Sequence, residues 1–179
     1  MAVTIKQTEA APAAYPAVPD GLSDKAAALD ATALWQRIEV YVAHRWSERA
    51  VTWIAEGPGE WVPPLAPATL DTVEVWHSDA WQSVTPPPSP VGGYELGCGT
   101  YRIAATVGAA PVPAAVEEAF RRLAEYLAAE KTYLHRPGVS SAKFNVDGLE
   151  QEATLSPAWK ARAMQLSGAA DLLRPYRRA

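Results

Sequence analysis

Residues 99–131 read GTYRIAATVGAAPVPAAVEEAFRRLAEYLAAEK, and this stretch carries the clearest secondary-structure pattern in the chain. Apolar residues alternate with others from Tyr101 to Val107, which predicts a half-buried β-strand. Gly108 ends the alternation, and Pro113 suits the first position of a helix because its missing N–H would have no partner there. Four apolar residues then recur at helical spacing and predict a buried stripe on a helix over 113–131: Val116, Phe120, Leu123 and Leu127.

The outer face of this predicted helix is charged. Glu117 precedes Arg121 by four residues, and Glu118 precedes Arg122 by the same spacing. Such pairs are neighbours on a helix surface. We therefore expect a solvated face opposite the apolar stripe.

Length, charge and cysteine content limit the classes of protein to which the chain can belong. At 179 residues it fits one domain, and it has a formal net charge of −4 and a single cysteine, Cys98. An acidic chain is not favoured as a bulk nucleic-acid binder. The sequence has no long apolar run and no secretory signal pattern, so we expect neither a membrane span nor export. One cysteine cannot form an internal disulfide, which suits assembly in the cytoplasm.

The rest of the chain predicts an α+β fold. We expect a helical bundle with an inserted small antiparallel β-sheet and extended N- and C-terminal arms. Asp30 is a good helix N-cap, and Ser156 followed by a proline predicts the start of a last helix. The predicted domains are listed in chain order: an Ala/Pro-rich arm over 1–29; an α+β core over 30–155, with a helix over 30–47, a β-rich insertion over 50–107 and the helix over 113–131; and a C-terminal helix and tail over 156–179.

Catalytic and metal-binding templates find little support in the sequence. Cys98 lies between two glycines, and His44, His77 and His135 are scattered without a surrounding motif. There is no CxxC, no HExxH and no Gly-rich phosphate loop. We therefore expect no catalytic residue, no cofactor and no metal, and we interpret Cys98 as a small, half-buried apolar residue.

The C-terminal tail has an unusual composition. From Lys160 onward the chain has five basic residues and one acidic residue, Asp171, although the whole chain is acidic. Three interpretations remain open: a solvated terminus, a nucleic-acid patch, or a docking peptide. Apolar residues interleaved with arginine favour the docking peptide, because such residues are enriched at protein–protein contacts.

Four segments together resemble a known family. They are a helix ending in RWSERAV (45–51), a strand-rich middle, the helix start VPAAV (112–116) and the tail LLRPYRR (172–178). In this order they resemble the head–tail connector (adaptor) proteins of long-tailed bacteriophages and of gene transfer agents. The likeness covers about residues 30–179 as an order of features, and the arm over 1–29 departs from the family pattern.

The resemblance implies a structural role in a virion or gene transfer agent particle. Adaptors of this family form a ring, usually of twelve copies, beneath the portal at the capsid vertex, and the ring extends the DNA channel. The expected partners are other copies of the chain, the portal, a stopper or tail-side connector, and DNA that passes without sequence-specific binding. The family's C-terminal segment engages the portal, which gives the expected portal-binding residues: Leu172, Leu173, Arg174, Pro175, Tyr176, Arg177 and Arg178.

Two alternatives of other classes stay open from the sequence. One is a β-rich carbohydrate- or peptide-binding module that uses Trp76 and Trp81. The other is an enzyme that uses Cys98 as its nucleophile, which would require a base within reach of the thiol. Deleting residues 172–179 distinguishes the adaptor hypothesis, since it predicts a folded protein that no longer attaches to the portal.

Overall fold

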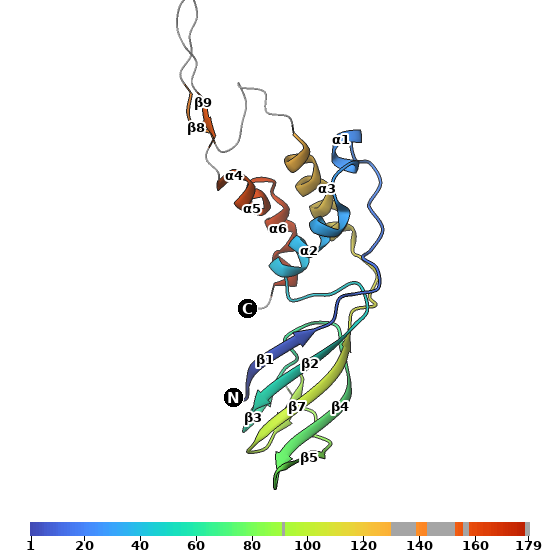
Figure 1. Ribbon diagram of the computed structural model, residues 1–179, viewed down its shortest axis with the longest axis vertical. Coiled ribbons are helices and arrows are strands. Elements are labelled where there is room, and N and C mark those ends of the chain that lie inside the picture. Colours follow the sequence, from blue (N-terminus) through green and yellow to red (C-terminus); the bar gives the residue numbers. More distant parts are fainter. Residues whose placement is uncertain (91, 130–138, 143–152, 156–157, 178–179) are drawn as a thin grey trace, which may run out of the picture. The chain divides into compact units, whose positions relative to one another are not determined.

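The computed structural model describes residues 1–90, 92–129, 139–142, 153–155 and 158–177 (Figure 1). The chain divides into two compact units. The first, here called the sheet unit, comprises Met1–Pro16, Glu39–Pro111 and Tyr176–Ala179. The second, the helical unit, comprises Ala17–Ile38 and Val112–Pro175.

A five-stranded antiparallel sheet forms the body of the sheet unit, in the order β1-β2-β7-β4-β5 (Figure 1). Its strands are β1 (Val3–Glu9), β2 (Arg49–Glu56), β4 (Ala68–His77), β5 (Ala80–Ser83) and β7 (Thr100–Val107). Strand β7 alternates strictly between half-buried and buried residues, as its sequence predicts. One face of the sheet is therefore apolar and buried, while the other is partly exposed, which is common for antiparallel sheets.

The apolar face is covered by a two-stranded sheet of β3 (Gly59–Trp61) and β6 (Tyr94–Leu96). Trp61 and Leu96 from these strands join Trp53, Ile103 and other residues of the main sheet in one buried core. We call the buried, apolar face of the main sheet the covered face, and we call the opposite face of that sheet the open face. The open face carries the intervening side chains: Thr52, Ile54, Glu74, Trp76, Arg102 and Ala104.

The end of β7 requires glycine. Gly108 has a φ of 96°, and a Cβ there would lie 2.3 Å from the backbone oxygen of Ser47. A side chain is therefore excluded both by conformation and by space. This close approach fixes the point where the chain leaves the sheet.

The helical unit is built around α3 (Ala114–Ala128), whose predicted stripe is confirmed at three fully buried positions: Val116, Phe120 and Leu123. The Trp35 ring packs 4.9 Å from the Phe120 ring, centroid to centroid. Helix α6 (Ala169–Leu173) packs against α3. The remaining elements are α1 (Asp24–Ala27), α2 (Ala31–Tyr41), β8 (Val139–Ala142), β9 (Ala153–Leu155), α4 (Ala158–Ala161), α5 (Ala163–Leu166), α6 (Ala169–Leu173) and the 3-10 helix η1 (Arg174–Tyr176).

The charged face of α3 differs in detail from the prediction. Glu118 pairs with Arg122, at 2.9 Å, as expected. Arg121, however, pairs with Glu118 at 3.1 Å rather than with Glu117. Both arginines thus share one carboxylate, because residues three and four apart lie on the same side of a helix.

The predicted helical bundle is wrong. The five-stranded sheet is a compact unit of its own rather than a small insertion, and three helices exceed four residues: α2, α3 and α6, among the described residues. The predicted helix over 30–47 ends at Tyr41, where the chain turns to feed β2. None of the described helices is long and apolar enough to cross a membrane.

The extended N-terminal arm is also wrong for residues 3–9, which form the edge strand β1. Two side chains explain why the apolar pattern did not mark this strand. Gln7 and Glu9 point to the covered face, where the Gln7 carbonyl accepts from the Trp53 indole at 2.8 Å and Glu9 accepts from Arg45. Polar residues at inward positions erase the alternation that indicates a strand.

Candidate functional site

The C-terminal segment is anchored at two points and exposed between and beyond them. Leu173 is fully buried in the helical unit, and Tyr176 is half-buried in the sheet unit. Leu172 is half-buried, while three side chains are exposed: Arg174, Pro175 and Arg177. Arg178, the last of the predicted portal-binding residues, lies outside the described residues, as do Ser156 and its following proline.

Tyr176 is held by an aromatic cluster. Its ring lies edge-on to the rings of His44 and Trp46, at centroid distances of 5.6 and 5.9 Å. Its carbonyl accepts a hydrogen bond of 3.0 Å from the backbone N–H of Ala43. Arg177 places its guanidinium 4.8 Å from the centre of the Tyr41 ring, a cation–π geometry.

His44 in this cluster favours its neutral form. Burial lowers its pKa below the ordinary 6.5, and the adjacent charge of Arg45 lowers it further. A neutral imidazole costs little to bury between Trp46 and Tyr176. A charged imidazole would lose its hydration there, and burying it would cost more free energy.

A buried ionic network lies within the sheet unit. Arg49 binds Glu39 in a two-point contact, with both nitrogen–oxygen distances 2.8 Å, and these side chains are each 4% exposed. Arg45 binds Glu9 in the same manner, at 2.6 and 3.0 Å, and Arg49 also reaches Glu9 at 3.1 Å. Two carboxylates and two guanidiniums thus tie β1, the end of α2 and the start of β2 together.

Arg45 also closes the end of α2. Its Nη1 donates to the carbonyl oxygens of Glu39 and His44, at 2.8 and 3.0 Å. The last carbonyls of a helix have no partner within the helix. Arg45 therefore stabilises the turn that carries the aromatic cluster.

Acid is expected to weaken the sheet unit through Glu9. Burial alone would raise its pKa, but the hydrogen bonds and charges of Arg45 and Arg49 outweigh burial and hold the pKa below the ordinary 4.5. As pH falls, the unfolded chain takes up this proton first. The contribution of Glu9 is thus complete above about pH 4.5 and is lost as pH falls through the lowered pKa.

Urea unfolding followed by tryptophan fluorescence across a pH series measures this loss. The Glu9→Gln variant should be less stable at pH 7 and should lose less stability than the wild type on acidification. Identical acid dependence in the two proteins would contradict the assignment.

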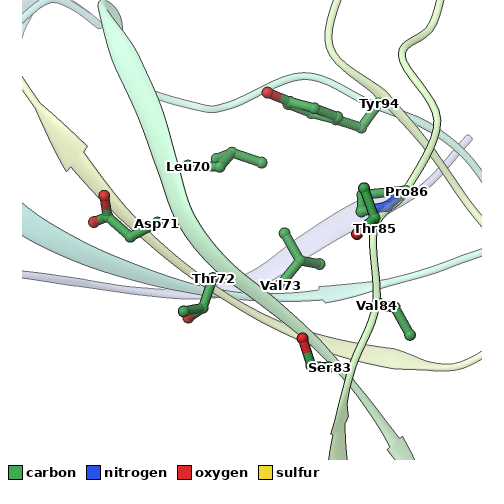
Figure 2. Close-up of a pocket in the computed structure, with 9 residues that line it drawn as sticks. All are labelled: Leu70, Asp71, Thr72, Val73, Ser83, Val84, Thr85, Pro86 and Tyr94. Carbon is green, nitrogen blue, oxygen red and sulfur yellow. The ribbon is translucent and has the colours of Figure 1, made fainter.

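A shallow groove of about 260 Å³ lies at the edge of the main sheet, beside β4 (Figure 2). Figure 2 shows Leu70 and Val73 of β4 and Tyr94 of β6 among the lining residues, with Ser83 at the end of β5 and Thr85 on the segment that follows. A bulge interrupts β4 between Leu70 and Thr72. The groove's one carboxylate, Asp71, accepts a 3.1 Å hydrogen bond from the Thr106 hydroxyl, and Tyr94 is the other titratable side chain among the lining residues.

The two tryptophans singled out by the sequence form a pair on the open face. Trp76 and Trp81 lie opposite each other in the β4–β5 register, with ring centroids 5.2 Å apart. Trp76 is 45% exposed. The Arg102 guanidinium lies 4.7 Å from the Trp81 ring centre, and its Nε is 2.7 Å from Glu74.

The fold does not bring Cys98 together with His44 or His77 in a catalytic arrangement. Cys98 is exposed rather than half-buried, His77 is exposed, and His44 lies in the aromatic cluster. His135 lies outside the described residues. Within the described part of the chain, no three His, Cys, Asp or Glu side chains are placed to hold a metal ion.

Searches against protein-family models, curated proteins and solved structures find no match to this chain.

The ionic network is the part of the structure that the sequence did not indicate. Its partners are 10 and 36 to 40 residues apart in the chain. The one available signal is the density of charge in RWSER, residues 45–49, beside the apolar strand that follows. Charges so close to a buried strand require partners, since an unpaired buried charge is costly.

Proposed function

We propose that this protein is a structural head–tail adaptor, which forms a ring beneath the portal of a phage or gene transfer agent particle and joins the capsid to the tail. The ring extends the channel through which DNA passes without sequence-specific binding. Its other partner is a stopper or tail-side connector. The proposal places the protein at the head–tail interface after assembly in the bacterial cytoplasm.

The anchored, exposed C-terminal segment is the observation that carries the proposal. Leu173 is packed within the helical unit, and Tyr176 is packed within the sheet unit. Arg174 and Pro175 project from this short stretch, and Arg177 follows it. A docking element with residues already packed in the fold loses less conformational entropy on binding than a free tail does.

The charge of the chain is compatible with a DNA channel. With a net charge of −4, an acidic ring would repel phosphate rather than hold it. Basic residues concentrated at the C-terminus then serve contact with protein. A strongly positive lumen in the assembled ring would contradict this part of the proposal.

Replacing Arg174 and Arg177 with alanine is expected to weaken binding to the portal by about tenfold to a hundredfold, because truncating a central interface arginine typically costs at least 1–2 kcal/mol. Fluorescence anisotropy of labelled protein titrated with portal rings from the same genome measures the change.

The matched control is Arg121→Ala/Arg122→Ala, which removes the same charge from the partly exposed face of α3. This control should bind the portal as the wild type does. An equal loss in both variants would show that net charge, rather than the C-terminal segment, determines binding.

A second candidate function is a carbohydrate- or peptide-binding module. The exposure of Trp76 on the open face of the sheet favours it, because an exposed aromatic side chain presents a large amphipathic contact area. A specific glycan-array signal that Trp76→Ala removes would support this candidate over the adaptor.

A further inference from the structure

The sheet unit presents a proline-rich loop on the side of its covered face. Pro87, Pro88 and Pro90 are exposed, whereas Ser89 between them is buried. The Ser89 hydroxyl donates to Glu60 of β3 at 2.6 Å, and its N–H donates to the Gly93 carbonyl at 3.0 Å. The loop is thus fastened at its centre to the layer that covers the apolar face.

The same unit presents the Trp76–Trp81 pair on its open face. In β4, Val73 is buried and Val75 packs against the core, while Glu74 and Trp76 point the other way. The position of Arg102 over Trp81 agrees with this, because Arg102 alternates with the buried Tyr101 and Ile103. The prolines and the tryptophans therefore lie on opposite sides of the sheet and cannot meet within one copy.

Exposed prolines and paired tryptophans are complementary in chemistry. Proline-rich segments adopt an extended, preformed helix that docks against aromatic side chains. The segment PPPSP, residues 86–90, fits this mode of recognition, and its ordering in the loop reduces the entropic cost of docking.

The two surfaces are also complementary in charge. Glu60 and Glu95 are exposed and lie opposite each other in the β3–β6 register, beside the prolines. Like charges in that position are unfavourable by themselves. On the open face, one cross-strand row runs through Lys6, Ile54, Arg102 and Glu74, and Glu74 pairs with Arg102 beside the tryptophans. This row has two basic side chains and one acidic side chain, so its net charge is opposite to that of the Glu60–Glu95 pair of another copy.

From these observations we propose that the proline loop of one copy, residues 86–90, docks on the Trp76–Trp81 pair of the next copy. Because each copy carries both halves on opposite sides, the contact is head-to-tail, and such contacts close into a ring when the rotation permits. This inference supplies the lateral joint of the ring and rests on the ring in the proposed function.

Two variants that each remove one half of the contact test the proposal. Trp76→Ala removes the aromatic half, and Pro87→Ala/Pro88→Ala removes the proline half. Each variant alone should show self-association weakened by about tenfold or more, with or without portal rings. A mixture of the two retains one intact contact and should form dimers but no larger species. Gln82→Ala and Thr85→Ala, which change exposed neighbours of each half, should assemble as the wild type does.

Sedimentation velocity of the wild type, each variant and the equimolar mixture gives the result. The proposal is supported if the mixture forms dimers and neither variant alone does. Unchanged assembly of either variant, larger species in the mixture, or a wild type that never self-associates would overturn it. Portal binding measured on the same variants keeps the two hypotheses separate: intact binding with failed dimers rejects only this contact, and the reverse rejects only the adaptor function.

Discussion

Replacing Arg49 with methionine is expected to lower the free energy of unfolding of the sheet unit by about 3–5 kcal/mol. Arg49 satisfies both oxygens of Glu39, whose side chain is 4% exposed. Without the guanidinium, the Glu39 carboxylate would remain buried without its two charged donors. Urea unfolding followed by tryptophan fluorescence measures the loss, since five of the seven tryptophans belong to the sheet unit.

Two comparisons isolate the buried charge as the cause. The double variant Glu39→Met/Arg49→Met should recover part of the lost stability, because replacing both partners of a buried pair removes the uncompensated charge. Arg122→Met breaks a partly exposed pair with Glu118 and should cost about 1 kcal/mol or less. A double variant that is no more stable than Arg49→Met would contradict the role assigned to the network.

Replacing Leu173 with alanine is expected to destabilise the helical unit by about 2–5 kcal/mol, the usual cost of truncating a buried leucine. Leu173 is fully buried at the end of α6, which packs against α3. Thermal unfolding followed by far-ultraviolet circular dichroism reports on this unit because it holds the helices α3 and α6.

Leu166→Ala is the matched control, since Leu166 is 42% exposed in the same unit and its truncation should cost about 0.5 kcal/mol. Equal stability of the two variants would mean that the C-terminal segment is not anchored at Leu173. The result also bears on the simplest test suggested by the sequence. A deletion of residues 172–179 removes this buried side chain together with the exposed arginines, so substitutions at Arg174 and Arg177 separate docking from folding.

Local patterns predicted the elements that bury one face. The alternation in residues 100–107 gave β7, and helical spacing gave the stripe of α3, because both periodicities depend on neighbouring residues alone. Pro113 lies one position before α3 rather than in it, within the usual uncertainty of helix ends.

Long-range pairing explains what the sequence did not show. Strand β1 exists because Gln7 and Glu9 meet Trp53, Arg45 and Arg49, more than thirty residues away. From the sequence, Leu172 and Leu173 are equal candidates for contact with the portal, although only Leu173 is fully buried in the structure. Whether a given leucine contacts a partner or its own fold depends on tertiary packing, which composition does not record.

Negative-stain microscopy of this protein mixed with portal rings from the same genome tests the adaptor function most directly. We predict an additional ring of density stacked on the portal with the wild type, and its loss with Arg174→Ala/Arg177→Ala. Portal rings that remain bare at saturating concentrations of the folded wild type would contradict the account.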